Sequence, residues 1–270
     1  MKFKYLLIII FFLCFCKTSF AYERIISLGP ATTEALFLLG AGDRLVGCTV
    51  YCQNPVEAKK KEKIGTVIEV NIEKVVSLKP DLVLATSLTD VQSAAKLKSL
   101  GINVITFSLA KNYLELCDNF LKLGELAGKK EEAKKIVEDS KNKVESIRKK
   151  FKNSQKTTVF VELGSKPLFA LTKDSFGNDF IEFAGGINIV KDLKVGFYSR
   201  EEVLKNNPDV IIVADMGIAG EEEKKVWEGY KVLRASRNKR IHVFDAYALC
   251  SPTPVSFVGT LEEMVKILQP

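Results

Sequence analysis

The sequence predicts an α/β protein with two lobes, each built on a largely parallel sheet, joined by one long α-helix. Three observations support this. Short β-rich runs alternate with helical patterns in both halves, an unbroken helical pattern spans residues 129–152, and a segment of the first half recurs in the second. Such alternation is typical of βαβ units. We expect a signal peptide over residues 1–21, lobes over 22–115 and 156–270, and a linking helix region over 116–155.

The two halves contain similar series of elements. In the first half, strands are predicted at residues 24–27, 81–84 and 103–107, with helices beginning near Thr32, Asn71, Thr89 and Asn112. In the second, strands are predicted at 158–161, 209–213 and 240–244, with helices beginning near Phe176, Arg200, Glu221 and Pro254. Because each half can form its own sheet, two lobes are the simplest arrangement.

The segment between the halves, residues 129–152, has no glycine or proline. Its apolar and small residues fall on one face at helical spacing: Ala133, Ile136, Val137, Ser140, Val144, Ile147 and Phe151. A helix of this length extends about 36 Å. That is long enough to join two lobes as a stiff rod, although a surface helix within one domain would show the same pattern.

An internal repeat supports the two lobes. Residues 71–84 align without gaps on residues 199–212. The identical pairs are Glu73/Glu201, Val75/Val203, Pro80/Pro208 and Asp81/Asp209. Average composition gives about one identity by chance over this length. Each copy is predicted to form a capped helix, a Pro-Asp turn and a buried strand.

The N-terminus has the features of a secretory signal. Lys2 and Lys4 precede an apolar run over residues 5–16, and small residues lead up to Ala21. About 12 apolar residues are too few to span a bilayer as a helix. We therefore expect cleavage after Ala21 and a periplasmic protein.

Six cysteines bear on the compartment and on cross-linking. A lipid anchor at Cys14 or Cys16 is disfavoured because bulky residues, not small ones, precede them. Cleavage leaves Cys48, Cys52, Cys117 and Cys250. In an oxidising compartment these permit two disulfides in three connectivities, among which the sequence does not choose.

Charge and motif content disfavour several function classes. Without the first 21 residues, 37 basic side chains face 33 acidic ones, and no basic block suggests nucleic-acid binding. The one histidine, His242, excludes histidine triads and multi-histidine metal sites. Phosphate-loop and nucleophile-elbow motifs are also absent from the sequence. We expect no catalytic residues, no metal site and no cofactor.

The first strand is followed by a turn suited to ligand binding. Residues 27–36 place Gly29 and Pro30 at the strand end and offer Thr32 or Thr33 as the cap of the next helix. Ligands of open α/β sheets bind beyond the carboxyl ends of the strands. The turn would then face a cleft between the lobes, although an ordinary helix start would use the same residues.

Several segments together resemble a known family. Residues 27–36, 51–55, 71–73, 185–189 and 199–201, in this order, are similar to the cobalamin and ferric-siderophore substrate-binding proteins of ABC importers. The resemblance runs over nearly the whole mature chain. It implies two Rossmann-like lobes bridged by a rigid helix, small hinge motion, a ligand held between the lobes, and a monomer.

The resemblance also implies a permease partner. In such proteins one surface glutamate per lobe forms a salt bridge with arginines of the membrane permease dimer. The matching residues are Glu73 and Glu201, which the repeat already pairs. The alternative is that both merely complement the helix dipoles next to the caps Asn71 and Ser199.

Candidate ligand residues follow from the same resemblance. Tyr51, Phe169 and Asp245 match cleft positions of cobalamin-binding members, and aromatic walls suit a large flat macrocycle. Val67 and Leu249 depart from the pattern, because those members carry a cleft tryptophan and a cleft arginine there. The ligand is therefore expected to be a corrinoid or an iron chelate.

Alternatives remain open from the sequence. A ferric siderophore with acidic groups would need cations such as Arg200 or Lys194, which otherwise form a solvated face. Haem is a further candidate, and an exported enzyme resembling the metal chelatases would need a metal-binding cluster, of which Asp245 alone is evident. Cys52 and Cys250 flank the expected cleft and could form a disulfide, bind a soft metal or be buried thiols.

Overall fold

The computed structural model describes residues 21–190, 193, 195–215 and 220–269. The expected signal peptide up to residue 20, the two cysteines within it and Lys194 lie outside these residues. No helix in the described segments is both long enough and apolar enough to cross a membrane.

The N-terminal lobe contains a five-stranded sheet. Its strands are β1 (Ile25–Ser27), β2 (Leu45–Cys48), β3 (Glu62–Lys63), β4 (Leu82–Thr86) and β5 (Val104–Phe107). All neighbours pair in parallel in the order β3-β2-β1-β4-β5. The helices are α1 (Pro30–Leu38), α2 (Ile72–Ser77) and α3 (Val91–Ser99), with short 3₁₀ turns at Gly42–Arg44 and Val56–Lys60. The chain switches sides of the sheet between β1 and β4, where ligands of such sheets bind.

The C-terminal lobe has the second sheet. Its strands are β6 (Thr157–Ser165), β7 (Leu168–Ala170), β8 (Gly186–Asn188), β9 (Val210–Asp215) and β10 (Ile241–Asp245). The order is β10-β9-β6-β7, with β8 also paired to β6, and only β7 runs antiparallel among these strands. Its helices are α6 (Phe176–Phe183), α7 (Arg200–Asn206), α8 (Gly220–Gly229), α9 (Arg234–Arg237) and α10 (Ala246–Cys250). The predicted two-lobed α/β fold is confirmed.

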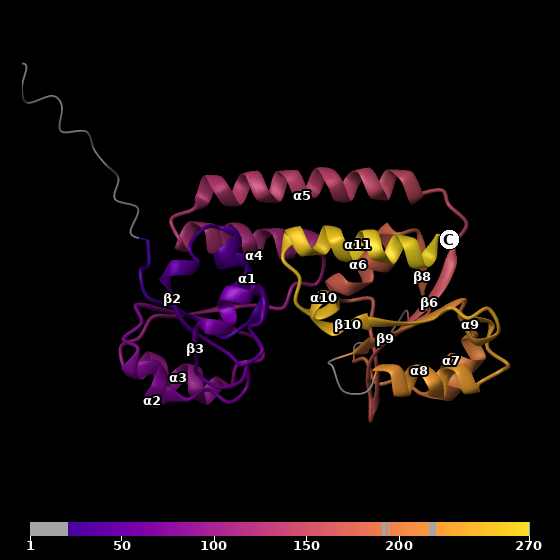
Figure 1. Ribbon diagram of the computed structural model, residues 1–270, viewed down its shortest axis with the longest axis horizontal. Coiled ribbons are helices and arrows are strands. Elements are labelled where there is room, and N and C mark those ends of the chain that lie inside the picture. The colour runs from indigo at the N-terminus through magenta and orange to yellow at the C-terminus, as the bar shows by residue number, and fades with distance from the viewer. Residues whose placement is uncertain (1–20, 191–192, 194, 216–219, 270) are drawn as a thin grey trace, which may run out of the picture.

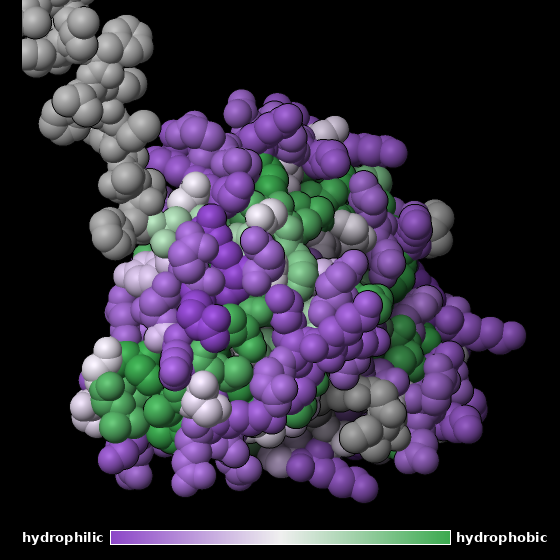
Figure 2. Space-filling view, turned by 60° about the vertical axis from the view of Figure 1, so that its left-hand side comes forward, coloured by the Kyte–Doolittle hydropathy of each residue, from purple (hydrophilic) through white to green (hydrophobic). Residues whose placement is uncertain are grey.

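A layer of helices bridges the two lobes. The long helix α5 (Lys130–Phe151) lies along α4 (Tyr113–Leu126) and α11 (Pro254–Leu268) and spans both lobes (Figure 1). The rod is therefore one of three neighbouring helices, and the expected boundary at residue 115 falls inside α4. The buried face of α5 comprises Ala133, Val137, Ser140 and Val144. Its outer face is charged, and the top of the molecule, where α5 lies, is mostly hydrophilic (Figure 2).

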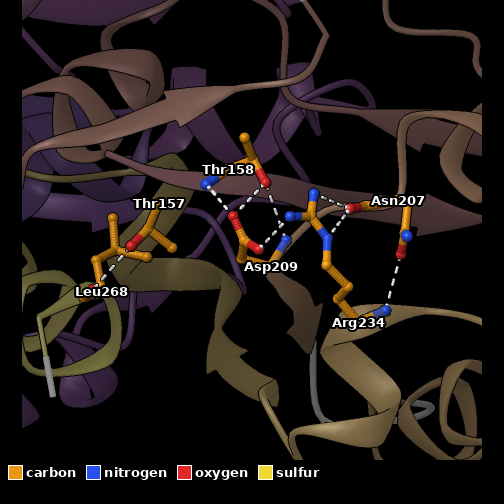
Figure 3. Close-up of polar contacts among 6 residues, drawn as sticks. All are labelled: Thr157, Thr158, Asn207, Asp209, Arg234 and Leu268. Carbon is orange, nitrogen blue, oxygen red and sulfur yellow. Dashed lines mark hydrogen bonds and ion pairs between the residues drawn. The ribbon is translucent and has the colours of Figure 1, made fainter. Parts of the chain in front are cut away.

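The repeat is visible as two equivalent helix–turn–strand units, α2–β4 and α7–β9. The backbone turns at Lys79 and Asn207, which occupy the same repeat position, with φ angles of 47° and 45°. In the second unit the Asp209 carboxylate accepts hydrogen bonds from the backbone N–H and hydroxyl of Thr158 at 2.9 and 2.6 Å (Figure 3). The Asp81 carboxylate likewise accepts from two backbone N–H groups that precede β1. The repeated Pro-Asp turn thus connects each unit to the central strand of its sheet.

The helix after β1 differs from the expectation. It begins at Pro30, with Gly29 in the capping position, and no side chain caps it, so the expected cap at Thr32 or Thr33 was wrong. Proline suits the first helical position because it has no N–H to satisfy and its φ is preset. The Thr32 hydroxyl instead donates to the Gly29 carbonyl at 2.9 Å and shares a hydrogen bond with Ser27 at 2.7 Å.

Three hydrophobic clusters divide the interior. The largest lies between the sheets and the bridging helices and draws on both lobes, with Ile25 and Leu82 from one sheet and Val159 and Val210 from the other. Two smaller clusters cover the opposite faces of the two sheets. The inner faces of the two lobes therefore share one core.

Candidate ligand-binding cleft

A cleft of about 750 Å³ lies between the lobes. From the N-terminal lobe it is lined by residues 29–32 after β1, 51–54 without Cys52, 86–88 at the end of β4, and 107–110 at the end of β5. From the C-terminal lobe it is lined by Asp215, residues 245–247 and residues 250–254. The cleft thus meets the carboxyl ends of both sheets, including the switch point between β1 and β4, as the turn after β1 predicted.

The cleft wall carries few charges. Among the described lining residues, the charged side chains are Lys59, Asp215 and Asp245. Asp215 accepts a hydrogen bond from the Gly220 N–H at 3.2 Å, and Asp245 accepts one from the Tyr247 N–H at 2.9 Å, which caps α10. Most of the remaining wall is aliphatic, aromatic or hydroxyl-bearing. Such a surface suits a large ligand with extensive apolar area and few anionic groups.

Two of the three predicted ligand residues line this cleft. Tyr51 is 54% exposed and extends from the loop after β2, and Asp245 stands exposed at the end of β10. Val67 also lines the cleft, whereas Leu249 is buried. The two departures from the family pattern therefore have different surroundings in this chain.

The third predicted ligand residue lies elsewhere. Phe169 is on β7, is 36% exposed, and meets Phe197 edge to face with ring centroids 5.5 Å apart. It is not among the described residues that line the cleft. As a binding residue it remains a prediction, and the aromatic pair forms an exposed apolar site of its own on the C-terminal lobe.

Arg200, the candidate cation for an acidic ligand that lies within the described residues, is engaged by other side chains. Arg200 places its Nη2 2.7 Å from Glu223 Oε2 and its guanidinium over the ring of Trp227 at 4.8 Å. It is engaged inside the C-terminal lobe and is not part of the described cleft lining. Trp227 is buried, as expected of a packing residue, and its Nε1 donates to Glu162 Oε2 at 2.6 Å.

The floor of the cleft carries polar contacts between the lobes that sequence reasoning missed. The Thr253 hydroxyl donates to Glu34 Oε1 at 3.0 Å, and the Tyr247 hydroxyl donates to the Pro30 carbonyl at 3.4 Å. Burial, with Glu34 as neighbour, raises the pKa of Tyr247 well above its usual range, so the phenol stays protonated. The sequence feature that could have identified Tyr247 is its position two residues after the end of β10. These contacts join α1 to α10 and the start of α11.

The two repeat glutamates occupy equivalent exposed positions. Glu73 lies in the first turn of α2 behind the cap Asn71, and Glu201 lies in the first turn of α7 behind the cap Ser199. Both helices lie on the lower side of the molecule, one on each lobe and opposite α5 (Figure 1). Hydrogen bonding with its own backbone N–H, and with Ser199, lowers the pKa of Glu201. Each lobe thus carries one of these exposed glutamates in a helix on the lower side of the molecule.

Comparison with known proteins identifies the family to which the chain belongs. A family model described as periplasmic binding protein matches residues 25–248. This chain belongs to the periplasmic binding protein family. The ABC transporter substrate-binding lipoprotein YvrC of Bacillus subtilis is 33% identical over 92% of this chain and 80% of its own. The vitamin B12-binding protein of Vibrio cholerae is 31% identical over 87% of this chain and 85% of its own.

Solved structures agree with this assignment. The periplasmic vitamin B12 binding protein BtuF of Vibrio cholerae has a TM-score of 0.79 at 30% identity, covering 92% of this chain and 97% of its own. A possible iron-binding periplasmic solute-binding protein of Staphylococcus epidermidis has a TM-score of 0.80 at 30% identity, covering 92% and 99%. The resemblance to substrate-binding proteins of ABC importers is confirmed. Each of these relatives is named as a binding protein.

Proposed function

We propose that this periplasmic binding protein captures a corrinoid in the cleft between its lobes and delivers it to an ABC permease without altering it chemically. The main support for this proposal is the weakly charged cleft, with the exposed phenol ring of Tyr51 on one wall and Asp245 on the other. A flat macrocycle gains wide apolar contact from such walls. The relatives from Vibrio cholerae named for vitamin B12 support the same ligand class.

An iron chelate is the second candidate ligand, supported by the structural neighbour from Staphylococcus epidermidis. Ferric siderophores with acidic groups call for arginine or lysine in the cleft, and Lys59 is the one such residue in its described lining. Haem would face the same apolar wall. A chelatase-like enzyme is disfavoured because this lining offers two carboxylates, Asp215 and Asp245, and no histidine in its described part.

The first test is calorimetric titration of residues 22–270 with cyanocobalamin, cobinamide, a ferric hydroxamate and haem. The proposal expects submicromolar binding of the corrinoids and at least a hundredfold weaker binding of the other two. Binding of the ferric hydroxamate or haem alone would move the ligand to the iron chelates. Binding of none of the four would contradict both candidates.

Docking to the permease is a second part of the proposal. We infer that Glu73 and Glu201 contact arginines of a permease dimer, one from each lobe of a monomeric binding protein. Changing both to alanine should abolish ligand uptake in a transport assay, while calorimetric affinity and melting temperature stay unchanged, because both side chains are exposed. Glu202→Ala, in the same first turn of α7, is the matched control and should preserve uptake. Loss of affinity or folding in the double variant would show a structural role instead.

Export is the third part. We infer that the mature chain begins at Tyr22 and is periplasmic, without a lipid anchor. Intact mass measurement of the protein secreted with its own N-terminus should give the mass of residues 22–270. A mass corresponding to a lipid-modified N-terminal cysteine would show an anchored form instead.

A further inference from the structure

Two cysteines meet beneath the loop that carries Tyr51. Cys48 is the last residue of β2, and Cys52 follows four residues later, after a turn closed by the Cys52 N–H donating to the Thr49 carbonyl at 3.1 Å. Both side chains are fully buried, at 0% exposure, and their thiols interact with each other, while the Cys48 thiol also donates to the Ala58 carbonyl at 3.6 Å. The fold has therefore brought two of the four mature cysteines next to each other.

The pair is surrounded by hydrogen-bond donors. The Thr33 hydroxyl donates to Cys52 Sγ at 3.1 Å, and the Thr49 hydroxyl lies 3.2 Å from the same sulfur. Lys63 Nζ donates to Cys48 Sγ at 3.2 Å and also donates to the backbone carbonyls of Cys52 and Ala58. A half-buried ammonium and two hydroxyls directed at a dithiol stabilise negative charge on sulfur.

The two thiols differ in acidity. Interaction with Cys48 and hydrogen bonding with Thr33 and Thr49 lower the pKa of Cys52. Interaction with Cys52, together with burial, raises the pKa of Cys48. The first proton of the pair therefore leaves Cys52, and its thiolate lies against the protonated Cys48. An attacking thiolate next to a second thiol is the arrangement that thiol–disulfide exchange uses.

The other two cysteines have different neighbours. Cys117 is buried on α4, and burial raises the pKa of its thiol. Cys250 belongs to the C-terminal lobe, where it lines the cleft.

We propose that Cys48 and Cys52 join in an intramolecular disulfide when the chain folds in an oxidising medium, while Cys117 and Cys250 remain thiols. Of the three connectivities that four cysteines allow, this pairing excludes the two that join Cys48 or Cys52 to Cys117 or Cys250. The cross-link closes the loop that presents Tyr51 to the cleft. Because the fold buries both sulfurs, the oxidant reaches them when the loop after β2 opens.

The oxidant is a small or protein-borne disulfide, such as glutathione disulfide. The Cys52 thiolate attacks one sulfur of that disulfide, whose S–S bond breaks and releases one thiolate, which takes up the proton that Cys48 loses. The Cys48 thiolate then attacks Cys52 Sγ, forms the new S–S bond and expels the second thiolate, which is protonated by solvent. Two protein thiols are oxidised and one disulfide is reduced to two thiols.

The test is refolding of reduced residues 22–270 in a glutathione redox buffer, followed by denaturation, alkylation of free thiols and trypsin digestion. Trypsin cuts after Arg44 and Lys59, so one peptide, residues 45–59, contains both cysteines. The expected peptide carries no alkyl group and is lighter by two hydrogen atoms than its reduced form. The intact chain should take up two alkyl groups instead of the four it takes up after full reduction.

Single cysteine substitutions test whether the number of alkyl groups taken up reports the pairing of Cys48 with Cys52. Cys48→Ser should raise alkylation from two groups to three, although it removes a cysteine, because Cys52 loses its partner. Cys117→Ser is the matched control and should lower the count to one. These counts are made on denatured chains, so burial of a free thiol does not lower them. Alkylation of all four cysteines after refolding, or a cross-link from residues 45–59 to Cys117 or Cys250, would overturn the proposal.

Discussion

At the scale of single residues, Tyr51 is a candidate ligand contact whose loss should affect binding more than folding. Its ring is 54% exposed in the cleft, so little of its apolar surface contributes to folding. We expect Tyr51→Ala to weaken corrinoid binding by about tenfold to a hundredfold, the loss of about 1.5–3 kcal/mol of ring contact. The melting temperature should not change. Tyr51→Phe keeps the ring and should retain most of the affinity in the same calorimetric titration. Equal affinities for wild type and Tyr51→Ala would remove Tyr51 from the site.

Glu162 is a buried residue whose charge should control stability. Its side chain is 1% exposed, and burial raises its pKa to about 7 although Trp227 donates to it. Between pH 4.5 and about 7 the folded state therefore binds more protons than the unfolded state, and the free energy of unfolding falls as pH rises. The loss is up to about 3 kcal/mol, from about 1.4 kcal/mol per pH unit.

Glu162→Gln should remove this part of the pH dependence. Gln retains an oxygen for the Trp227 indole and has no charge to bury. Urea unfolding at pH 5 and pH 8 should show a smaller difference in the variant than in wild type. The exposed Glu262→Gln variant is the control and should reproduce the wild-type difference. An unchanged difference in Glu162→Gln would mean that other groups carry the pH dependence.

At the scale of elements, the Pro-Asp turns attach each repeat unit to its sheet. Asp209 is the stronger attachment, because it contacts Thr158 and also lies 3.0 Å from Arg234 Nη1, with its side chain 26% exposed (Figure 3). Desolvation by burial raises the pKa of Asp209, but the hydrogen bonds from Thr158 and the charge of Arg234 outweigh it, so the pKa is lowered overall. We expect Asp209→Ala to reduce the free energy of unfolding by about 2 kcal/mol at pH 7.

The equivalent substitution in the first unit, Asp81→Ala, is the natural comparison. Asp81 is exposed and accepts from two backbone N–H groups, so its loss should cost less. Because the native pKa of Asp209 is lowered, its contribution is present at neutral pH and is lost as pH falls through that pKa. Chemical denaturation at pH 7 and pH 3 measures both effects. A larger cost for Asp81→Ala would contradict this ranking.

Helices and strands with a clear local sequence pattern could be predicted from the sequence, whereas those determined by tertiary contacts could not. The repeat identified α2–β4 and α7–β9, and one-sided apolar spacing identified α5 within a residue at each end. The strand β3 has two residues, and β7 and β8 have three each, too short for periodicity to show. The start of α1 was misplaced because Pro30 was taken as part of a turn and not as a first helical residue.

Some residues of the candidate site could likewise be predicted from local sequence, and others could not. Tyr51 and Asp245 reach the cleft because each follows a strand, and parallel strands end at the same edge. The cross-lobe contacts of Tyr247 with Pro30 and Thr253 with Glu34 join residues more than 200 positions apart. A single sequence contains no local signal for such pairs, because they depend on how the bridging helices set the lobes.

At the scale of the whole molecule, the core shared by both lobes implies that they unfold together. Phe257 of α11 lies within it, with its ring centroid 4.4 Å from that of Tyr113 and 4.2 Å from that of Phe180. We expect one cooperative transition in which far-UV circular dichroism, which reports both lobes, coincides with the fluorescence of Trp227, the sole tryptophan. Trp227 belongs to the separate cluster on the far face of the second sheet.

Phe257→Ala tests this coupling. Removing a fully buried phenylalanine should lower the free energy of unfolding by about 3–5 kcal/mol. If the lobes are coupled, both probes shift by the same amount, although Phe257 and Trp227 lie in different clusters. Val226→Ala, on the exposed side of α8 next to Trp227, is the control and should shift neither probe by more than about 0.5 kcal/mol. A dichroism curve that splits into two steps, with fluorescence following only one, would show lobes that fold independently and a bridging layer that holds them without coupling them.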